Sequence, residues 1–149
     1  MRTIEVTRTI LAPREAVFDV TAHIERFAEV IPHITNVEFL TSSKTGVGTR
    51  FIETRTMGKR VASSTLEVTE YEPPESIRLV SDEGGTIWDT RFTYEPSDGG
   101  TDLTMIMEIR PHTLLARLMT PFIKRFVAKA VESDIEAVKQ HCEGNWASS

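Results

Sequence analysis

A chain of 149 residues with 40% hydrophobic and 26% charged content has the size and composition of one ordinary globular domain, and we interpret residues 1–149 as a single domain. Its formal net charge of −5, without a run of basic residues, argues against nucleic acid as a partner. No long apolar run is present, so stable membrane insertion is not expected. The single cysteine, Cys142, excludes an intramolecular disulfide and favours a cytoplasmic location.

The N-terminal stretch "TIEVTRTI" alternates apolar and polar residues, which predicts a strand whose apolar face is interrupted by Arg8. The next stretch, "APREAVFDVTAHIERFAEVIP", has Pro13 at a predicted first helical position and stops before Pro32. We therefore expect one or two short helices after the first strand.

Four further segments are rich in β-branched and aromatic residues and predict strands: "NVEFLTSS", "GTRFIETRT", "RVASSTLEVTEY" and "SIRLVSDE". The segments "KTGVG", "MGK", "EPPE" and "EGGT" separate them as turns. No internal repeat or linker is present, so the strands belong to one sheet-forming unit.

The segment "WDTRFTYEPSDGGTDLTMIMEIRP" predicts a β-hairpin, because Asp98-Gly99 favours a tight turn with φ above zero at both residues. That turn sets the pairs on one apolar face: Trp88 with Ile109, Thr90 with Met107, Phe92 with Met105, and Tyr94 with Leu103. The other face pairs Asp89, Arg91 and Thr93 with Glu108, Ile106 and Thr104. We expect this second face to be mostly solvated.

From Thr113 onward the apolar residues recur with helical spacing. The pattern predicts one long amphipathic helix with two rows of apolar residues: Leu115, Met119, Phe122, Phe126 and Ala130, then Val127, Val131, Ile135, Val138 and Cys142. Thr120-Pro121 predicts either a kink or a new helix start capped by Thr120. The apolar face of this helix can cover the apolar face of the sheet.

This order of elements, with "ILAPREAVFDVTAHIERFAEVIPHI", "GVGTRF", "LEVTEYEPPESIRLV" and "PFIKRFVAKAVESDIEAVKQH", resembles the START-related helix-grip superfamily, also called SRPBCC, in its polyketide cyclase/dehydrase-like branch. The resemblance implies an α+β helix-grip fold. A curved antiparallel sheet of about seven strands would wrap around the C-terminal helix, with two short helices after the first strand. It also implies a cavity between sheet and helix that holds a lipid, quinone or polyketide.

Given this resemblance, residues on the helix-facing side of the sheet, and residues of the C-terminal helix opposite them, are predicted to line the cavity. The predicted ligand-binding residues are Phe51, Ser64, Leu66, Trp88, Thr90, Phe92, Met105, Met107, Met119, Phe122 and Phe126. Methionine suits a wall that adapts to differently shaped apolar ligands. The alternative is that these side chains simply fill the core.

Two polar residues on the strand "GTRFIETRT" are the catalytic candidates. If Phe51 points inward, Glu53 and Arg55 do so as well, and with a turn at Met57-Gly58 the next strand adds Ser64 and Leu66. A buried carboxylate beside an arginine could act as acid or base or orient a ligand's polar end. A one-residue shift in register would instead expose both groups to solvent. Arg8 and Asp134 are each expected to be a rim or ion-pair residue rather than a catalytic residue.

No metal or cofactor is expected, because the histidines His23, His33, His112 and His141 lack ligand spacing and no nucleotide-binding glycine motif is present. The main functional hypothesis is a carrier or sensor of a hydrophobic small molecule, as monomer or homodimer. One alternative is a polyketide cyclase or aromatase acting on a ligand in the same cavity. A second alternative is a coenzyme Q-binding or toxin-like module. The segment "RFAEVIPHI" resembles that branch, although His33 stands where the branch usually has an aromatic residue.

Overall fold

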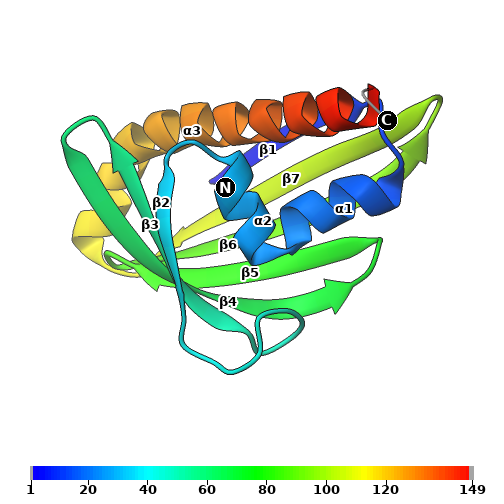
Figure 1. Ribbon diagram of the computed structural model, residues 1–149. Coiled ribbons are helices and arrows are strands. Elements are labelled where there is room, and N and C mark those ends of the chain that lie inside the picture. Colours follow the sequence, from blue (N-terminus) through cyan, green and yellow to red (C-terminus); the bar gives the residue numbers. More distant parts are fainter. Residues whose placement is uncertain (1, 148–149) are drawn as a thin grey trace.

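The structure of the protein is a computed structural model that describes the backbone of residues 2–147 and the side chains of residues 2–144. The elements in chain order are β1 (Thr3–Ile10), α1 (Arg14–Ala22), α2 (Ile24–Val30), β2 (Ile34–Phe39), β3 (Arg50–Met57), β4 (Arg60–Glu72), β5 (Ser76–Glu83), β6 (Thr86–Ser97), β7 (Gly100–Pro111) and α3 (Leu114–Ala147). The predicted α+β helix-grip arrangement of seven strands, two short helices and a long C-terminal helix is confirmed (Figure 1).

The seven strands form one antiparallel sheet in the order β1-β7-β6-β5-β4-β3-β2. The β6–β7 hairpin has the predicted register, with Trp88 opposite Ile109 and Phe92 opposite Met105. The predicted turn conformation was wrong in one respect: Gly99 has a φ of 77°, whereas Asp98 does not have a positive φ. A turn that requires the left-handed region only at its second central residue needs a glycine there and nothing unusual before it.

All three helices lie on the same face of the curved sheet, which we call the inner face (Figure 1). The α3 helix packs along β1 and β7, while α1 and α2 cover one end of the inner face. Phe18 of α1 makes edge-to-face contacts with Tyr94, at 5.1 Å between ring centroids, and with Tyr71, at 5.6 Å. His23 adopts an extended conformation between α1 and α2, and its side chain caps α2 by accepting a hydrogen bond from the Arg26 amide.

The α3 helix is continuous through Pro121, so the predicted new start at Thr120 is wrong. The Thr120 hydroxyl instead donates to the carbonyl oxygen of Ala116, at 2.6 Å, inside the helix. The part of α3 drawn in yellow runs at an angle to the orange and red remainder, in agreement with the predicted kink (Figure 1).

The expectation that both apolar rows of α3 face the sheet was also wrong. At 100° per residue the two rows lie about 140° apart around the helix, so one straight contact surface cannot cover both. The row that contains Val131, Ile135 and Val138 is buried, whereas Phe122 is 72% exposed. The α3 helix therefore has one apolar side in the core and a second, along its first half, in solvent.

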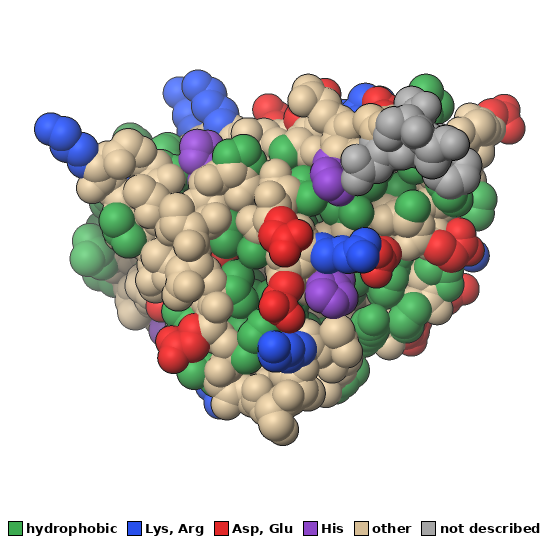
Figure 2. All heavy atoms as spheres, in the orientation of Figure 1, with side chains coloured by type: hydrophobic (Ala, Val, Ile, Leu, Met, Phe, Trp, Pro, Cys, Tyr) green, Lys and Arg blue, Asp and Glu red, His purple; other side chains and the backbone are tan. Residues whose placement is uncertain are grey.

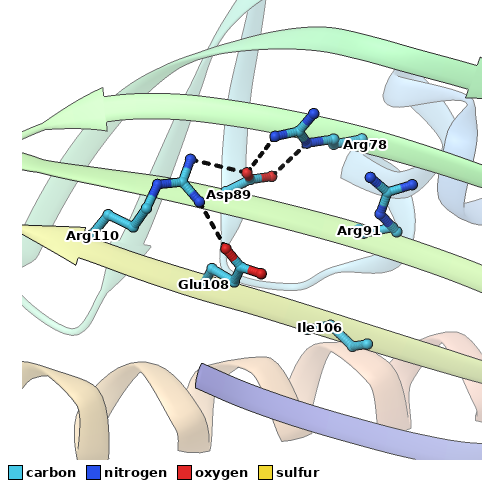
Figure 3. A pocket seen from close by; sticks show the side chains of 6 residues that line it. All are labelled: Arg78, Asp89, Arg91, Ile106, Glu108 and Arg110. Carbon is cyan, nitrogen blue, oxygen red and sulfur yellow. Dashed lines mark hydrogen bonds and ion pairs between the residues drawn. The ribbon is translucent and has the colours of Figure 1, made fainter. Parts of the chain in front are cut away.

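The outer face of the sheet carries a network of ion pairs (Figure 3). Asp89 lies at its centre, 2.6 Å from Arg78 and 3.0 Å from Arg110, while Arg110 also contacts Glu108 at 2.9 Å. The prediction that this face is mostly solvated was wrong for Asp89, which is 8% exposed, because neighbouring guanidinium groups cover it. Arg78, Asp89, Arg91, Ile106, Glu108 and Arg110 line a hollow of about 440 Å³ on this face.

Candidate functional site on the inner face

The alternation along β3 brings Glu53 and Arg55 to the inner face, beside Phe51, which is buried. The register to β4 places Phe51 opposite Leu66 and Glu53 opposite Ser64, so Ser64 and Leu66 share the face of Phe51, as predicted. The predicted turn was wrong by one residue, because Met57 pairs with Arg60 and the turn residues are Gly58 and Lys59. The predicted and the observed turn place the same β4 side chains on the inner face, because the two registers differ by two residues and side chains alternate with period two.

Arg55 joins β3 to α3 through an ion cluster, which we call the Arg55 cluster. Its Nε donates to Glu53 Oε1 at 2.7 Å, and its terminal nitrogens lie 2.9 and 3.1 Å from the two carboxylate oxygens of Asp134. The three side chains are 21%, 15% and 11% exposed for Arg55, Glu53 and Asp134. Of the two registers that the sequence left open, the structure therefore adopts the inward one. Asp134 forms an ion pair, as expected.

Burial shapes the electrostatics of the Arg55 cluster. Burial alone would lower the pKa of Arg55, but the coulombic attraction of Glu53 and Asp134 outweighs it and holds that pKa above its ordinary value. Burial also raises the pKa of the Asp134 carboxyl, although Arg55 opposes the shift. The cluster thus presents a permanent cation to the inner face, together with a carboxyl that takes up a proton more readily than an exposed aspartate does.

The predicted ligand-binding residues fall into three groups by exposure. Phe51, Phe92 and Met105 are buried in the core. Ser64, Leu66, Trp88, Thr90 and Met107 are partly exposed on the inner face. Met119, Phe122 and Phe126 are exposed on the far side of α3, at 44%, 72% and 50%, and do not face the sheet. The second group, with the Arg55 cluster, is the candidate site.

Two residues of this site were missed in the sequence. Leu79 and Ser81 of β5 face inward, because they pair with Thr90 and Trp88 of β6. Ser81 is 5% exposed and its hydroxyl has no hydrogen-bond partner among the described residues. The alternation in "SIRLVSDE" places both residues on one face, so the signal was present once the face was assigned. A buried hydroxyl without a partner is rare in folded proteins.

A second hollow, of about 400 Å³, lies between α1 and the β4–β5 turn. Its lining residues are Glu15, Phe18, Asp19, Ala22, His23, Thr45, Tyr71, Pro73 and Pro74. Neither this hollow nor the one on the outer face is lined by the predicted ligand-binding residues. The predicted cavity between the sheet and α3 therefore remains a proposal.

His112 lies at the junction of β7 and α3, where its Nε2 is 2.8 Å from Asp82 Oδ1. Within residues 2–147, no group of three or more His, Cys, Asp or Glu side chains is placed to hold a metal ion.

Comparison with known proteins agrees with this architecture. A protein from Thermus thermophilus, TTHA0849, superposes with a TM-score of 0.78 at 18% identity, over 99% of both chains. The di-domain ARO/CYC StfQ from the steffimycin biosynthetic pathway superposes with a TM-score of 0.82 at 11% identity, over 98% of this chain and 52% of that one. At these identities the likeness establishes the shared helix-grip fold.

The sequence comparison extends from the fold to a family. The model of the family described as "Polyketide cyclase / dehydrase and lipid transport" matches residues 1–143, and the chain belongs to this family. The uncharacterized protein Rv1546 of Mycobacterium tuberculosis is 32% identical over 91 residues, which span 60% of this chain and 59% of the mycobacterial protein. The chain is thus a helix-grip domain in a family whose description names polyketide cyclases, dehydrases and lipid transport.

Proposed function

We propose that the protein is a carrier or sensor that binds a hydrophobic small molecule, of lipid, quinone or polyketide type, on the inner face of the sheet. The observation that carries the proposal is the partial exposure of apolar side chains on a face that the helices should bury. Leu66, Leu79, Trp88 and Met107 all contact the core and all remain accessible to solvent. Apolar side chains around a few convergent polar groups are typical of small-molecule sites.

The polar groups of the site favour a ligand with one polar end. Arg55 supplies fixed guanidinium donors, and the Ser81 hydroxyl lies on the same face without a partner among the described residues. A ligand oxygen that accepts from the Ser81 hydroxyl would satisfy a buried polar atom that is costly to leave unpaired. The apolar body of the ligand would then lie against Trp88 and Met107, whose ring and thioether adapt to its shape.

A second function is favoured by one observation, the raised pKa of the largely buried Asp134 carboxyl. A buried carboxyl that takes up a proton more readily than an exposed aspartate can act as a general acid, as the ring closure and dehydration of a cyclase require. Under this alternative Glu53, Arg55 and Asp134 would contact the reacting carbonyl groups of a bound polyketide. We rank it below the carrier because the Arg55 cluster is already internally paired.

Native mass spectrometry of gently purified protein, followed by organic extraction, tests the proposal. We expect an adduct of one reproducible mass that extraction removes. Met107→Trp fills the space beside Thr90 and should abolish the adduct, whereas Val47→Trp, at a position that is 65% exposed in the β2–β3 connection, should leave it unchanged.

The same experiment separates the two functions. Glu53→Gln keeps an oxygen that can accept from Arg55, so a carrier should retain its ligand in this variant. An enzyme should retain binding and lose conversion of the extracted molecule. A ligand-free mass for the unaltered protein, or an adduct that Met107→Trp leaves unchanged, would refute the carrier proposal.

A further inference from the structure

The first half of α3 carries an exposed apolar surface that the fold does not use. Its members, which we call the α3 outer patch, are Leu114 (74% exposed), Leu115 (70%), Leu118 (63%), Met119 (44%), Phe122 (72%), Ile123 (38%) and Phe126 (50%). Their spacing of one and four residues keeps them on one side of a helical segment about 20 Å long. A contiguous exposed apolar patch of this kind marks an interaction site.

Four basic residues lie along this part of α3: Arg117, Lys124, Arg125 and Lys129. At 100° per residue, Arg125 and Lys129 lie on the side of the patch, whereas Arg117 and Lys124 lie on the opposite side. The segment 111–131 contains no Asp or Glu, although the whole chain has a formal net charge of −5. Among the described residues none of these four side chains forms an ion pair, whereas the arginines of the sheet are extensively paired. Only Lys124 and Arg125 are adjacent in the sequence, and the spacing of four residues places Arg125 and Lys129 on one side of α3.

In Figure 2 basic side chains project from the upper left edge, where Figure 1 draws the orange part of α3 and the β3–β4 hairpin, whereas acidic and basic side chains are mixed near the centre of this view. A partner for the α3 outer patch must therefore be apolar where it meets the helix and anionic around it. A second copy of this chain fits poorly, since a two-fold contact through the patch would bring the same cations together.

We propose that the α3 outer patch docks on the surface of an anionic lipid bilayer, with its apolar side chains inserted among the acyl chains and the cations Arg125 and Lys129 at the level of the lipid phosphates. An exposed apolar helix face flanked by Lys and Arg is the pattern of helices that lie in the membrane interface. The cations add electrostatic attraction to anionic lipids, and their long side chains extend toward the headgroups. No helix among the described residues is long and apolar enough to cross a membrane. This proposal goes beyond ligand binding and does not depend on it.

Vesicle flotation tests the proposal with the full chain. We expect binding to vesicles of phosphatidylcholine with about a quarter phosphatidylglycerol, and much weaker binding to pure phosphatidylcholine vesicles. The pair Phe122→Ser and Phe126→Ser should weaken binding at least about tenfold, because two exposed rings of the patch are lost. The pair Arg125→Gln and Lys129→Gln should also weaken it about tenfold and reduce its dependence on salt.

The matched control is the pair Lys44→Gln and Val47→Ser, which removes one exposed cation and one exposed apolar side chain from the β2–β3 connection. In Figure 1 this connection lies at the opposite end of the molecule from α3. The control should bind vesicles like the unaltered protein. All the substituted side chains lie outside the core, so thermal melting followed by circular dichroism should be unchanged.

Three outcomes would overturn the proposal: no flotation with either vesicle, equal binding to both vesicles, or equal weakening in the control. A dimer in sedimentation equilibrium that dissociates in the Phe122 and Phe126 variant, without vesicle binding, would assign the patch to a second copy instead. Met107→Trp should leave flotation unchanged. Loss of the ligand and loss of vesicle binding are therefore separate results, and each proposal can fail alone.

Discussion

Replacement of Arg55 by methionine should destabilise the protein through the carboxylates that it leaves behind. Arg55 makes one contact of 2.7 Å to Glu53 and contacts of 2.9 and 3.1 Å to Asp134, and all three side chains are largely buried. Removal of one partner from a buried ion pair costs about 3 to 5 kcal/mol. Since 11% to 21% of each side chain remains exposed, we expect the lower value, about 3 kcal/mol.

The pH dependence distinguishes this mechanism from a simple loss of packing. Burial already raises the pKa of Asp134, and without Arg55 that pKa should rise further in the folded state. A carboxyl whose pKa is higher in the folded than in the unfolded state stabilises the fold as it takes up its proton. The deficit of Arg55→Met relative to the unaltered protein should therefore shrink from about pH 7 to about pH 5.

Urea unfolding at both pH values measures the effect. Arg26→Met is the matched control, because Arg26 pairs with Asp19 on the surface, where both side chains are at least half exposed. That pair should contribute less than about 1 kcal/mol. An Arg55→Met deficit below about 1 kcal/mol that does not change with pH would refute the reasoning.

Three further outcomes are expected. Hydrogen bonding to Arg78 lowers the pKa of Asp89. The ionised Asp89 carboxylate therefore stabilises the fold above the ordinary carboxyl pKa, and this stabilisation is lost as the pH falls through the lowered pKa. In urea unfolding, Asp89→Asn should cost about 2 kcal/mol near pH 7 and much less near pH 3. A Cβ on Gly100 would lie 2.1 Å from a β1 carbonyl oxygen, so Gly100→Ala should lower the melting temperature. Gly144 lies in α3 with open space around it, so Gly144→Ala should raise the free energy of unfolding by up to about 1 kcal/mol. Burial raises the pKa of the Cys142 thiol to about 11, so iodoacetamide near pH 8 should alkylate it at least about 100-fold more slowly in folded than in urea-unfolded protein; equal rates would contradict the burial.

The sheet was predictable because side chains alternate between the two faces of a strand, and this alternation can be read directly from the sequence. In β6 and β7 the period of two and the position of the turn together determine which residues share a face, and the structure has the predicted pairs. Even the misplaced β3–β4 turn preserved the face, because the error was two residues in register. Glu53 and Arg55 could therefore be candidates for the inner face before their partner on α3 was known, although a one-residue shift that would have exposed both stayed open.

The orientation of α3 was less predictable. Helical periodicity shows which apolar residues form a row along the helix, but it does not show which row packs against the sheet. Phe122 and Val131 both belong to apolar rows, yet only Val131 is buried. Asp89 was misjudged for a similar reason, since the arginines that cover it come from the neighbouring strands. The burial of Asp89 and the exposure of Phe122 depend on the tertiary packing of strands and helices, and the local spacing of residues does not determine that packing.

The division of α3 into two apolar sides has a consequence for the evolution of the protein. The buried side, with Val131, Ile135 and Val138, determines whether the chain folds, whereas the outer side, with Phe122 and Phe126, makes no comparable demand on the core. Substitutions on the outer side can therefore accumulate without loss of the fold. One helix thus carries two independently variable sets of residues, and descendants with the same core could differ widely in the surfaces to which they attach.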